Sequence, residues 1–427
     1  MSTPPKFEKI LSLYEGGFYS EVLPKVKTYL NKNRDSSAAW NVLGLSYRFL
    51  GDTAKSEYVF KQLVLKNPLN VGFRSNLANL YMNQGQTDRA ANLYQSALSI
   101  DPDNISTLLG LGLCHINSNS LGEATQAYEK ILAVEPKNHE AGYQLATISR
   151  KCGNFARAVE LFDNLDDSKS KIHQADCLYC LQDIDRFKAS CAELMKKKYM
   201  DPLLGSLIQH ANIEHDLRLE NPFCDNALDY VAHENLLDLG LLDASMVRTL
   251  LDFHERKEAD YRGQPLLEKG EQTSGNIFTS SESFVPDLEQ AMMDYVSRYR
   301  ERYGAADEGF LKKFPKNFKL YGWLIEINSG GFLKPHIHKE GWVSASMYLK
   351  VPSVQGNEAG IEFSYHGADY PGSPDKFPST CYNIREGDIC MFPSSLFHRT
   401  NSFTDDNTRV SFAFDVHPRT NIRESHD

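Results

Sequence analysis

Histidine is the residue whose spacing in this sequence most clearly indicates metal chemistry. His336 and His338 flank one residue in the run GGFLKPHIHKEGW, and His398 follows in GDICMFPSSLFHRTN. On a β-strand, a spacing of two places both side chains on the same face. Imidazoles that two neighbouring strands present to one point, with one side of the metal left open, suit Fe(II) and its small-molecule co-ligands. The pattern therefore predicts a metal site at His336, His338 and His398.

A cationic site is predicted beside these histidines. Arg409 comes eleven residues after His398, and Ser411 follows two residues later in the run TRVSFAF. The alternation of this run predicts a strand with Arg409 and Ser411 on one face. A guanidinium fork binds a carboxylate through two parallel hydrogen bonds, and a serine hydroxyl can assist it. Tyr348, on another predicted strand, is a further candidate for this pocket.

The segment that contains these residues has the pattern of a β domain. From Phe318 onward, short alternating apolar runs are separated by Gly, Pro and Asn, which is typical of strands and turns. Several short strands at this spacing predict a sandwich or a barrel. Gly330 and Gly331 are interpreted as a turn before the strand of His336. The predicted strands lie near 318–328, 332–338, 342–350, 360–365, 388–393 and 408–416. Upstream, helices are predicted near 243–260 and 285–303, with a long polar loop at 264–281 between them.

The first half of the chain contains an internal repeat with a period of about 34 residues. The first clear copy has Trp40, Leu43, Gly44 and Tyr47 in the pattern W-x2-L-G-x2-Y, with Pro68 at its end. One period leads from Leu43 to Leu77 and a second to Leu111, and the same two steps lead from Pro68 to Pro102 and Pro136. This pattern resembles the tetratricopeptide repeat, a helix–turn–helix unit that buries its apolar face only by stacking into a solenoid. Degenerate copies are expected at 3–36 and 171–203.

The spacing H-x-H, H-x10-R-x-S of the second half resembles that of Fe(II)- and 2-oxoglutarate-dependent oxygenases. The runs HIHKEGWVSASMYLKVP, GIEF, GDICMFPSSLFHRT and RVSFAFDV are similar to a bacterial branch with an HxH motif. Many members of that branch carry tetratricopeptide repeats upstream. The resemblance implies a double-stranded β-helix, Fe(II) as cofactor and 2-oxoglutarate as co-substrate. It also implies that His398 is a metal ligand, that Arg409 binds the far carboxylate of 2-oxoglutarate, and that no catalytic residue acts beyond the metal ligands.

The metal ligands can be assigned in more than one way. Most members of the family use two histidines and a carboxylate in HxD or HxE, whereas His338 occupies the position of that carboxylate here. Either His336 and His338 both bind the metal, or His338 and Glu340 form a shifted HxE pair. A third alternative leaves His336 and His398 as the only protein ligands. We favour the first, because HxH is the pattern of the branch that this sequence resembles.

The expected architecture is a multidomain α plus β protein. We predict an N-terminal α-solenoid of tetratricopeptide repeats at 1–204 and an oxygenase domain at 205–427. The second domain comprises a helical lead-in at 205–316 and a double-stranded β-helix, or jelly roll, at 317–418. The repeats are expected to recruit a protein or peptide for hydroxylation, with Asn41, Asn76 and Asn79 on the first helices of repeats. The alternatives are a three-histidine cupin enzyme that does not use 2-oxoglutarate, and a non-catalytic repeat scaffold.

Composition and charge restrict the possible partners and compartments. Of the 427 residues, 41% are hydrophobic and 24% are charged, as in ordinary globular proteins. A formal charge of −10 argues against nucleic acid or an anionic membrane as the main partner. No apolar stretch reaches the roughly 18 residues of a membrane span, and no secretory signal pattern is present. Eight cysteines are too sparse for a disulfide framework, so a reducing, cytoplasmic location is expected.

Overall fold

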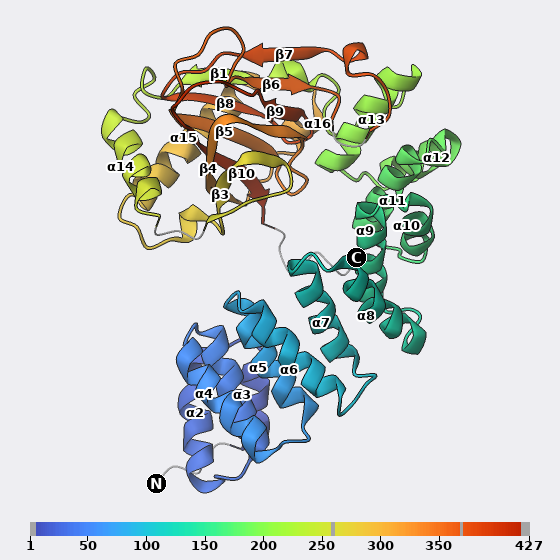
Figure 1. Ribbon diagram of the computed structural model, residues 1–427, viewed down its shortest axis with the longest axis vertical. Helices are drawn as coiled ribbons and strands as arrows, with labels where there is room; N and C mark the ends of the chain where they lie inside the picture. The colour runs from blue at the N-terminus through green and yellow to red at the C-terminus, as the bar shows by residue number, and fades with distance from the viewer. Residues whose placement is uncertain (1–5, 258–260, 368–369, 420–427) are drawn as a thin grey trace. The chain divides into compact units, whose positions relative to one another are not determined.

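The chain folds into two compact units. The computed structural model describes residues 6–257, 261–367 and 370–419 (Figure 1). The contacts between residues divide the chain into Met1–Asp166 and Asp167–Asp427. Within the described ranges, no helix is long and apolar enough to cross a membrane. The predicted boundary between the repeat solenoid and the oxygenase domain, at 204/205, stays a prediction.

The first unit is a series of helix pairs. Its described residues form α1 (Phe7–Glu15), α2 (Tyr19–Lys32), α3 (Ser37–Phe49), α4 (Thr53–Lys66), α5 (Val71–Asn83), α6 (Thr87–Leu98), α7 (Ile105–Asn117), α8 (Leu121–Val134), α9 (His139–Lys151) and α10 (Phe155–Asp163). The first helices of four successive pairs begin after capping side chains that recur with the period of the repeat. Ser36, Asn70, Asn104 and Asn138 each accept a hydrogen bond from the backbone N–H three residues further on. These N-caps fix where each repeat starts.

Small residues set the spacing between helices in this unit. A Cβ atom added at Gly110 on α7 would lie 2.4 Å from Cζ of Tyr94 on α6. At Gly112 it would lie 2.6 Å from Cζ of Tyr128 on α8. Both tyrosine rings are fully buried, so neighbouring helices pack against the backbone of α7. The predicted solenoid is confirmed, and its period follows from these recurring caps and contacts.

The second unit begins with three more helices. These are α11 (Ser168–Cys180), α12 (Ile184–Lys196) and α13 (Pro202–His215). The first two form the helix pair that the sequence predicts at 171–203. In the core of the unit, Tyr179 of α11 contacts His210 of α13, with 2.6 Å between the phenol oxygen and Nδ1. His210 Nε2 lies 2.9 Å from Nδ1 of His366, which follows strand β6 (Ile361–Ser364). The helices therefore pack directly against the β part of the same unit.

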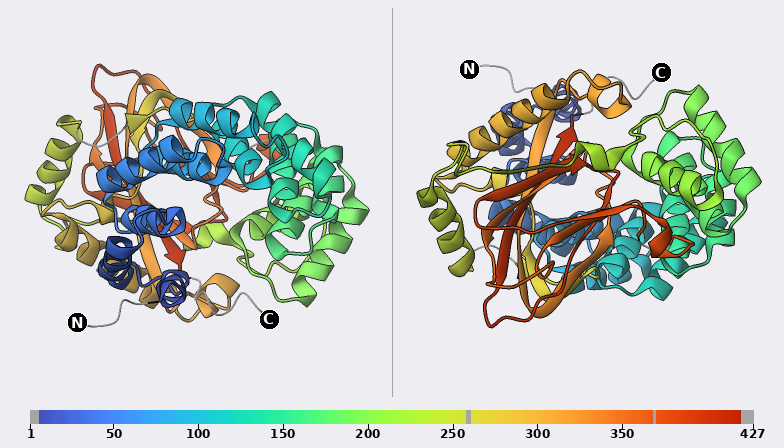
Figure 2. Two further views of the ribbon diagram at one scale, coloured as in Figure 1. Left: turned by 90° about the horizontal axis from the view of Figure 1, so that it is seen from below. Right: turned by 90° about the horizontal axis from the view of Figure 1, so that it is seen from above.

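The β part is an antiparallel, nearly closed jelly roll. Besides β6, its strands are β1 (Ala232–Asn235), β2 (Tyr261–Arg262), β3 (Leu267–Thr273), β4 (Phe318–His336), β5 (Val343–Lys350), β7 (Ser379–Tyr382), β8 (Asp388–Pro393), β9 (Phe397–Thr400) and β10 (Arg409–Pro418). Their order is β1-β8-β5-β10-β4-β9-β6-β7, and β3 pairs with β2 and β4. The helices α14 (Ala244–Glu255) and α15 (Val285–Tyr303) cover one side of this sheet (Figure 2). A short helix, α16 (Gly309–Lys312), precedes β4. The predicted fold class is confirmed.

The polar segment at 264–281 is not the uninterrupted loop that the sequence predicts. Leu267–Thr273 forms β3, which pairs with β4 beside the site. Only the two ends of this strand, Leu267 and Thr273, are buried. The apolar alternation that signals a strand is therefore missing, although the backbone is paired. The predicted helix at 243–260 is present as α14, and its last part, at 258–260, lies outside the described residues.

The predicted turn at Gly330 and Gly331 is also wrong, because β4 continues through both glycines to His336. Gly330 has a φ of +72°, and a Cβ added at Gly331 would lie 2.7 Å from the carbonyl oxygen of Glu268. The glycines thus permit an irregular strand that passes close to β3, instead of reversing the chain. His398 lies within the short strand β9, where the sequence analysis predicts no strand.

Candidate functional site

The three predicted histidines meet at the edge between β4 and β9. His336 is the last residue of β4, and its backbone pairs directly with that of His398 in β9. His338 follows two residues after the strand ends. One ring nitrogen from each of these three side chains lies within 4.8 Å of the other two. Strand pairing thus brings together residues that are about sixty positions apart in the sequence.

The hydrogen bonds of the three rings determine which nitrogen atom is free. Nδ1 of His336 lies 2.9 Å from the carbonyl oxygen of Lys334, and Nδ1 of His398 lies 3.3 Å from that of Leu396. A carbonyl only accepts, so each Nδ1 carries the proton and each Nε2 keeps its lone pair. Nδ1 of His338 likewise donates to a carboxylate oxygen at 2.6 Å, which belongs to Asp415. All three Nε2 atoms are therefore free to bind a metal.

The distance between two of these free nitrogens fits a shared metal ion. Nε2 of His338 lies 3.2 Å from Nε2 of His336. Two nitrogens bound to one metal at about 2.1 Å, at angles between tetrahedral and octahedral, are separated by roughly 3.0–3.4 Å. With both Nδ1 atoms protonated, neither Nε2 atom has a proton to donate to the other. A cation between them would remove the repulsion of their lone pairs.

Burial favours the neutral form of the His336 and His398 rings. Burial, followed by the neighbouring His338, lowers the pKa of His336 to about 3. Burial, followed by the charges of the two neighbouring histidines, also lowers the pKa of His398 well below its usual value. Because a metal binds only the neutral imidazole, these shifts favour coordination over protonation.

Asp415 is a site residue that the sequence analysis missed. It lies on β10 and is 5% exposed. Burial by itself raises the pKa of this carboxyl, but His338, together with hydrogen bonds from His338, His417 and Ser344, outweighs burial and holds the pKa below its ordinary range. The signal was present in the sequence, because residues 409, 411, 413 and 415 alternate on one face of the strand.

The predicted anion-binding residues lie together on β10 and β5. Arg409 is 2% exposed, and its Nε donates to the carbonyl oxygen of Ala359 at 3.0 Å. Its guanidinium lies 4.8 Å from the centre of the Tyr348 ring, and Tyr348 pairs with Ser411 across the two strands. In the described parts of the chain, no carboxylate forms an ion pair with Arg409, and the hydroxyls of Ser411 and Tyr348 have no hydrogen-bond partner.

A single cavity of about 210 Å³ joins the histidines to Arg409 and Ser411. It is lined by Gln264, Gln272, Trp323, Ile325, Leu333, His336, His338, Ala345, Ser346, Ile361, Phe392, His398, Thr400, Arg409, Ser411 and Ala413. Tyr348 lies behind Arg409 and is not part of this lining. An uncompensated buried cation and an unsatisfied hydroxyl are costly unless a ligand completes them. These residues therefore fit an anion that also reaches a metal at the histidines.

Glu340, the alternative third ligand, is not part of the group of metal-binding side chains formed by His336, His338 and His398. Its side chain is 72% exposed and forms an ion pair with Lys169 at 3.4 Å. Reaching the metal would require Glu340 to leave this contact and turn inward. The structure therefore brings together the HxH pair and His398, but not the shifted HxE pair.

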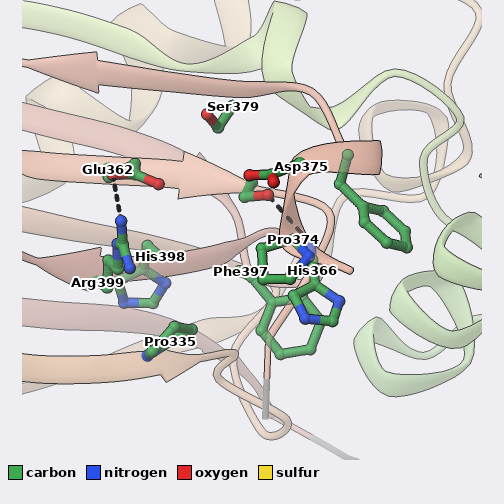
Figure 3. Close-up of a pocket in the computed structure, with 11 residues that line it drawn as sticks. Pro335, Glu362, His366, Pro374, Asp375, Ser379, Phe397, His398 and Arg399 are labelled. Atoms are coloured by element: carbon green, nitrogen blue, oxygen red, sulfur yellow. Dashed lines mark hydrogen bonds and ion pairs between the residues drawn. The ribbon is translucent and has the colours of Figure 1, made fainter. Parts of the chain in front are cut away.

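A second cavity, of about 400 Å³, lies against the outer face of β6 and β9 (Figure 3). Figure 3 shows the ion pair between Glu362 and Arg399 on this face, with His366 and Phe397 nearby. Its lining consists of Pro335, Glu362, Ser364, His366, Pro374, Asp375, Phe377, Ser379, Phe397, His398 and Arg399. His366, Pro374, Asp375, Phe377 and Ser379, which follow β6 in the sequence, form one wall of this cavity. His398 lines both cavities, whereas His336, His338, Arg409 and Ser411 line the first and not this one.

Comparisons with known proteins agree with both halves of the motif analysis. Residues 322–415 match a family described as "Putative 2OG-Fe(II) oxygenase", and residues 78–118 match a family described as TPR repeat. The predicted resemblance to both families is confirmed. The first match spans the three histidines, Arg409, Ser411 and Asp415.

Several solved structures are similar to the helical part of this chain. A tetratricopeptide repeat protein from Parabacteroides merdae is 21% identical, with 48% of this chain and 84% of that chain covered and a TM-score of 0.39. PilW, a type IV pilus biogenesis factor, is 17% identical, with 47% and 96% covered and a TM-score of 0.42. PilF from Pseudomonas aeruginosa is 14% identical, with 44% and 88% covered and a TM-score of 0.40. No curated protein matches the sequence.

Proposed function

We propose that this protein is an Fe(II)- and 2-oxoglutarate-dependent oxygenase. The observation that carries the proposal is one cavity with two chemically different ends. At one end, three imidazoles bring their free Nε2 atoms close together. At the other, the buried guanidinium of Arg409 has no acidic partner among the described residues, and the Ser411 hydroxyl is unsatisfied. A dicarboxylate that chelates iron at one end would satisfy both.

Each residue then has a defined task. His336, His338 and His398 hold Fe(II) through Nε2, and their Nδ1 hydrogen bonds keep the rings oriented. Arg409 binds the distal carboxylate of 2-oxoglutarate, Ser411 donates to it, and Tyr348 supports the guanidinium through its ring face. When bound, the iron and 2-oxoglutarate supply the oxidation of a C–H bond by O₂, with succinate and CO₂ as co-products. The protein contributes orientation and exclusion of side reactions.

The rival function is a three-histidine metalloenzyme of the cupin type that does not use 2-oxoglutarate. The observation in its favour is the ligand set itself, which lacks the direct carboxylate of most 2-oxoglutarate oxygenases. Under that alternative, the buried Arg409 and the open hydroxyl of Ser411 have no task. Their place in the same cavity as the histidines favours the 2-oxoglutarate oxygenase.

Turnover of 2-oxoglutarate tests this proposal. Purified protein supplied with Fe(II) and ascorbate should convert 2-oxoglutarate to succinate, at least slowly without a second substrate. Oxygen consumption without succinate formation would favour the cupin alternative. Wild-type turnover that continues in excess EDTA would contradict both.

We infer further that the substrate is a cytoplasmic protein or peptide recruited by the repeats. Repeat solenoids offer extended surfaces that suit polypeptides, and tetratricopeptide repeats generally mediate contacts between proteins. Asn76 of α5 donates to Oδ1 of Asn41 on α3 at 2.8 Å, and both side chains are half-buried, so this pair can contact a peptide backbone. Asn79 instead accepts from the hydroxyl of Tyr94 at 2.5 Å, which gives it a structural role.

The recruitment step is tested at this asparagine pair. Candidate substrates would be captured with the inactive His398→Ala protein and identified by a +16 Da product formed with the wild type. The double variant Asn41→Ala with Asn76→Ala should then raise KM for that substrate and leave uncoupled 2-oxoglutarate turnover unchanged. Asn79→Ala is unsuitable, because it would leave the Tyr94 hydroxyl without its partner. An unchanged KM would contradict recruitment at this pair.

A further inference from the structure

The three histidines include no carboxylate ligand, but a carboxylate, that of Asp415, contacts one of them. His338 stands where most members of the oxygenase family have Asp or Glu, and its ring donates to Asp415. The distance from Nδ1 to Oδ1 is 2.6 Å, which is typical of a strong charge-assisted hydrogen bond. We propose that Asp415 is the positioning carboxylate of the metal centre, acting on the metal through His338. This inference rests on the proposed metal site and deepens it.

The surroundings of Asp415 direct its carboxylate to His338. Asp415 is 5% exposed, and in the described parts of the chain its ion-pair partners are His338 and, at 3.6 Å, His417. No lysine or arginine in those parts pairs with it. A buried carboxylate without such a cation is costly, so the short contact with His338, together with the weaker contacts of His417 and Ser344, compensates its burial.

The backbone packs closely against the pair formed by His338 and Asp415. A Cβ atom added at Gly341 would lie 3.0 Å from Cγ of Asp415 and 2.8 Å from Oγ of Ser394. The carbonyl oxygen of Ser394 accepts the backbone N–H of His338 at 3.2 Å, and Asp415 pairs with Ser344 in the sheet. The imidazole is thus held at both its backbone and its Nδ1, with Nε2 facing the other histidines.

Such an arrangement has two consequences for the metal. Asp415 fixes the tautomer in which Nε2 is the free donor, and it makes that nitrogen a stronger base. It also places one negative charge beside the metal, as a directly bound carboxylate does in HxD enzymes. The charge of the centre is preserved although the carboxylate has moved outward.

The proposal is tested by moving the carboxylate from position 415 to position 338. Co(II) affinity would be measured on the full chain by its visible absorption, in competition with a chelator. Asp415→Asn should weaken Co(II) binding by about tenfold to a hundredfold. His338→Asp should also bind weakly, because it sets a second carboxylate against Asp415. The double variant His338→Asp with Asp415→Asn restores one carboxylate and should recover affinity to within about tenfold of the wild type.

A matched control is available in the same sheet. Asp388 on β8 is also buried, and it pairs with an imidazole, that of His233, at 3.0 Å. It does not line the cavity of the three histidines. Asp388→Asn should leave Co(II) affinity unchanged. Equal affinity of Asp415→Asn and the wild type, or a double variant no tighter than His338→Asp alone, would overturn the proposal.

A measurement on the wild type covers the case in which these variants fail to fold. In metal-free protein labelled with ¹⁵N-histidine, the nitrogen–proton correlations of His338 should show the proton on Nδ1, with a strongly downfield shift. The signal is assigned by through-space contacts between the ring of His338 and that of Trp323, whose centroids lie 5.5 Å apart. A proton on Nε2 would overturn the proposal. Neither readout requires 2-oxoglutarate turnover, so weakened Co(II) binding without succinate formation would contradict only the proposed function.

Discussion

Contacts in the repeat unit join helices that are neighbours in the sequence, whereas the site in the jelly roll joins residues that are far apart in the sequence. In the repeats, a packing contact such as that of Gly112 with Tyr128 joins neighbouring helices, and the contact of Gly44 with Phe60 repeats it two periods earlier. In the jelly roll, the cavity residues come from positions between 264 and 413, and each occurs once. The stability of the repeats is therefore distributed over many similar contacts. The chemistry of the site depends on the register of a few strands.

The largest effect that this comparison predicts is at His398. His398→Ala leaves His336 and His338, and two imidazoles do not hold Fe(II) tightly at neutral pH. Metal binding and succinate formation should both be abolished, whereas urea unfolding of the repeat unit should be unchanged. Metal content after dialysis and succinate yield check the first expectation. A variant that retains stoichiometric iron would show that the site does not depend on His398.

The next prediction concerns the stability of the repeat unit. Gly110→Ala forces a methyl group against the buried Tyr94 ring and should destabilise the repeat unit by about 1–3 kcal/mol. Gly122→Ala is the control, because Gly122 of α8 has open space around it, and it should stabilise by up to about 1 kcal/mol. Urea unfolding measures both. Effects of the same sign would contradict the packing explanation of the repeat.

Acid should weaken the second unit through His210. Burial, followed by His366, His215 and Lys376, lowers the pKa of His210 to about 3. In the unfolded chain a histidine titrates near 6.5, so the stability due to the neutral ring is present above that pH. It is lost as the pH falls from about 6.5 towards 3, by up to about 1.4 kcal/mol per pH unit.

His210→Gln removes this titration and should flatten the pH dependence of unfolding by about that amount between pH 6 and 4. The free energy of unfolding of both proteins, measured in urea at several pH values, checks the prediction. Parallel profiles for the variant and the wild type would show that His210 does not link this unit to pH.

The smallest expected effect distinguishes the two ligand assignments. Glu340 is exposed and forms a surface ion pair with Lys169, so Glu340→Ala should change metal affinity by less than about twofold. Titration with Mn(II) measures it. A loss as large as that of His398→Ala would identify the shifted HxE pair as ligands and contradict the HxH assignment.

Much of the architecture could be predicted because its signals are local. The period of the repeats, the caps at Asn70 and Asn104, and the alternation in β10 are visible in the sequence itself. Strand β3 could not be predicted, since its polar residues are held by backbone pairing with β4. The tautomers of the histidines could not be predicted either, because their partners are a carboxylate 77 positions away and carbonyl oxygens that carry no sequence signal.

The role of Asp415 could be predicted from the sequence only in part. Its position on the same strand face as Arg409 and Ser411 follows from the alternation, but its contact with His338 depends on the course of the chain after β4. Sequence patterns therefore identified the metal-binding residue types and the anion-binding arginine, and the fold was needed to connect them.

The most direct test of the central claim is a calorimetric titration of 2-oxoglutarate into Mn(II)-loaded protein, comparing the wild type with Arg409→Ala. The claim is that one cavity binds a metal at its histidine end and a carboxylate at its arginine end. We predict one binding site per wild-type chain and tenfold to hundredfold weaker binding to Arg409→Ala, about 1.5–3 kcal/mol, with Mn(II) affinity unchanged. Equal affinity for 2-oxoglutarate without Arg409, or without the metal, would contradict the claim.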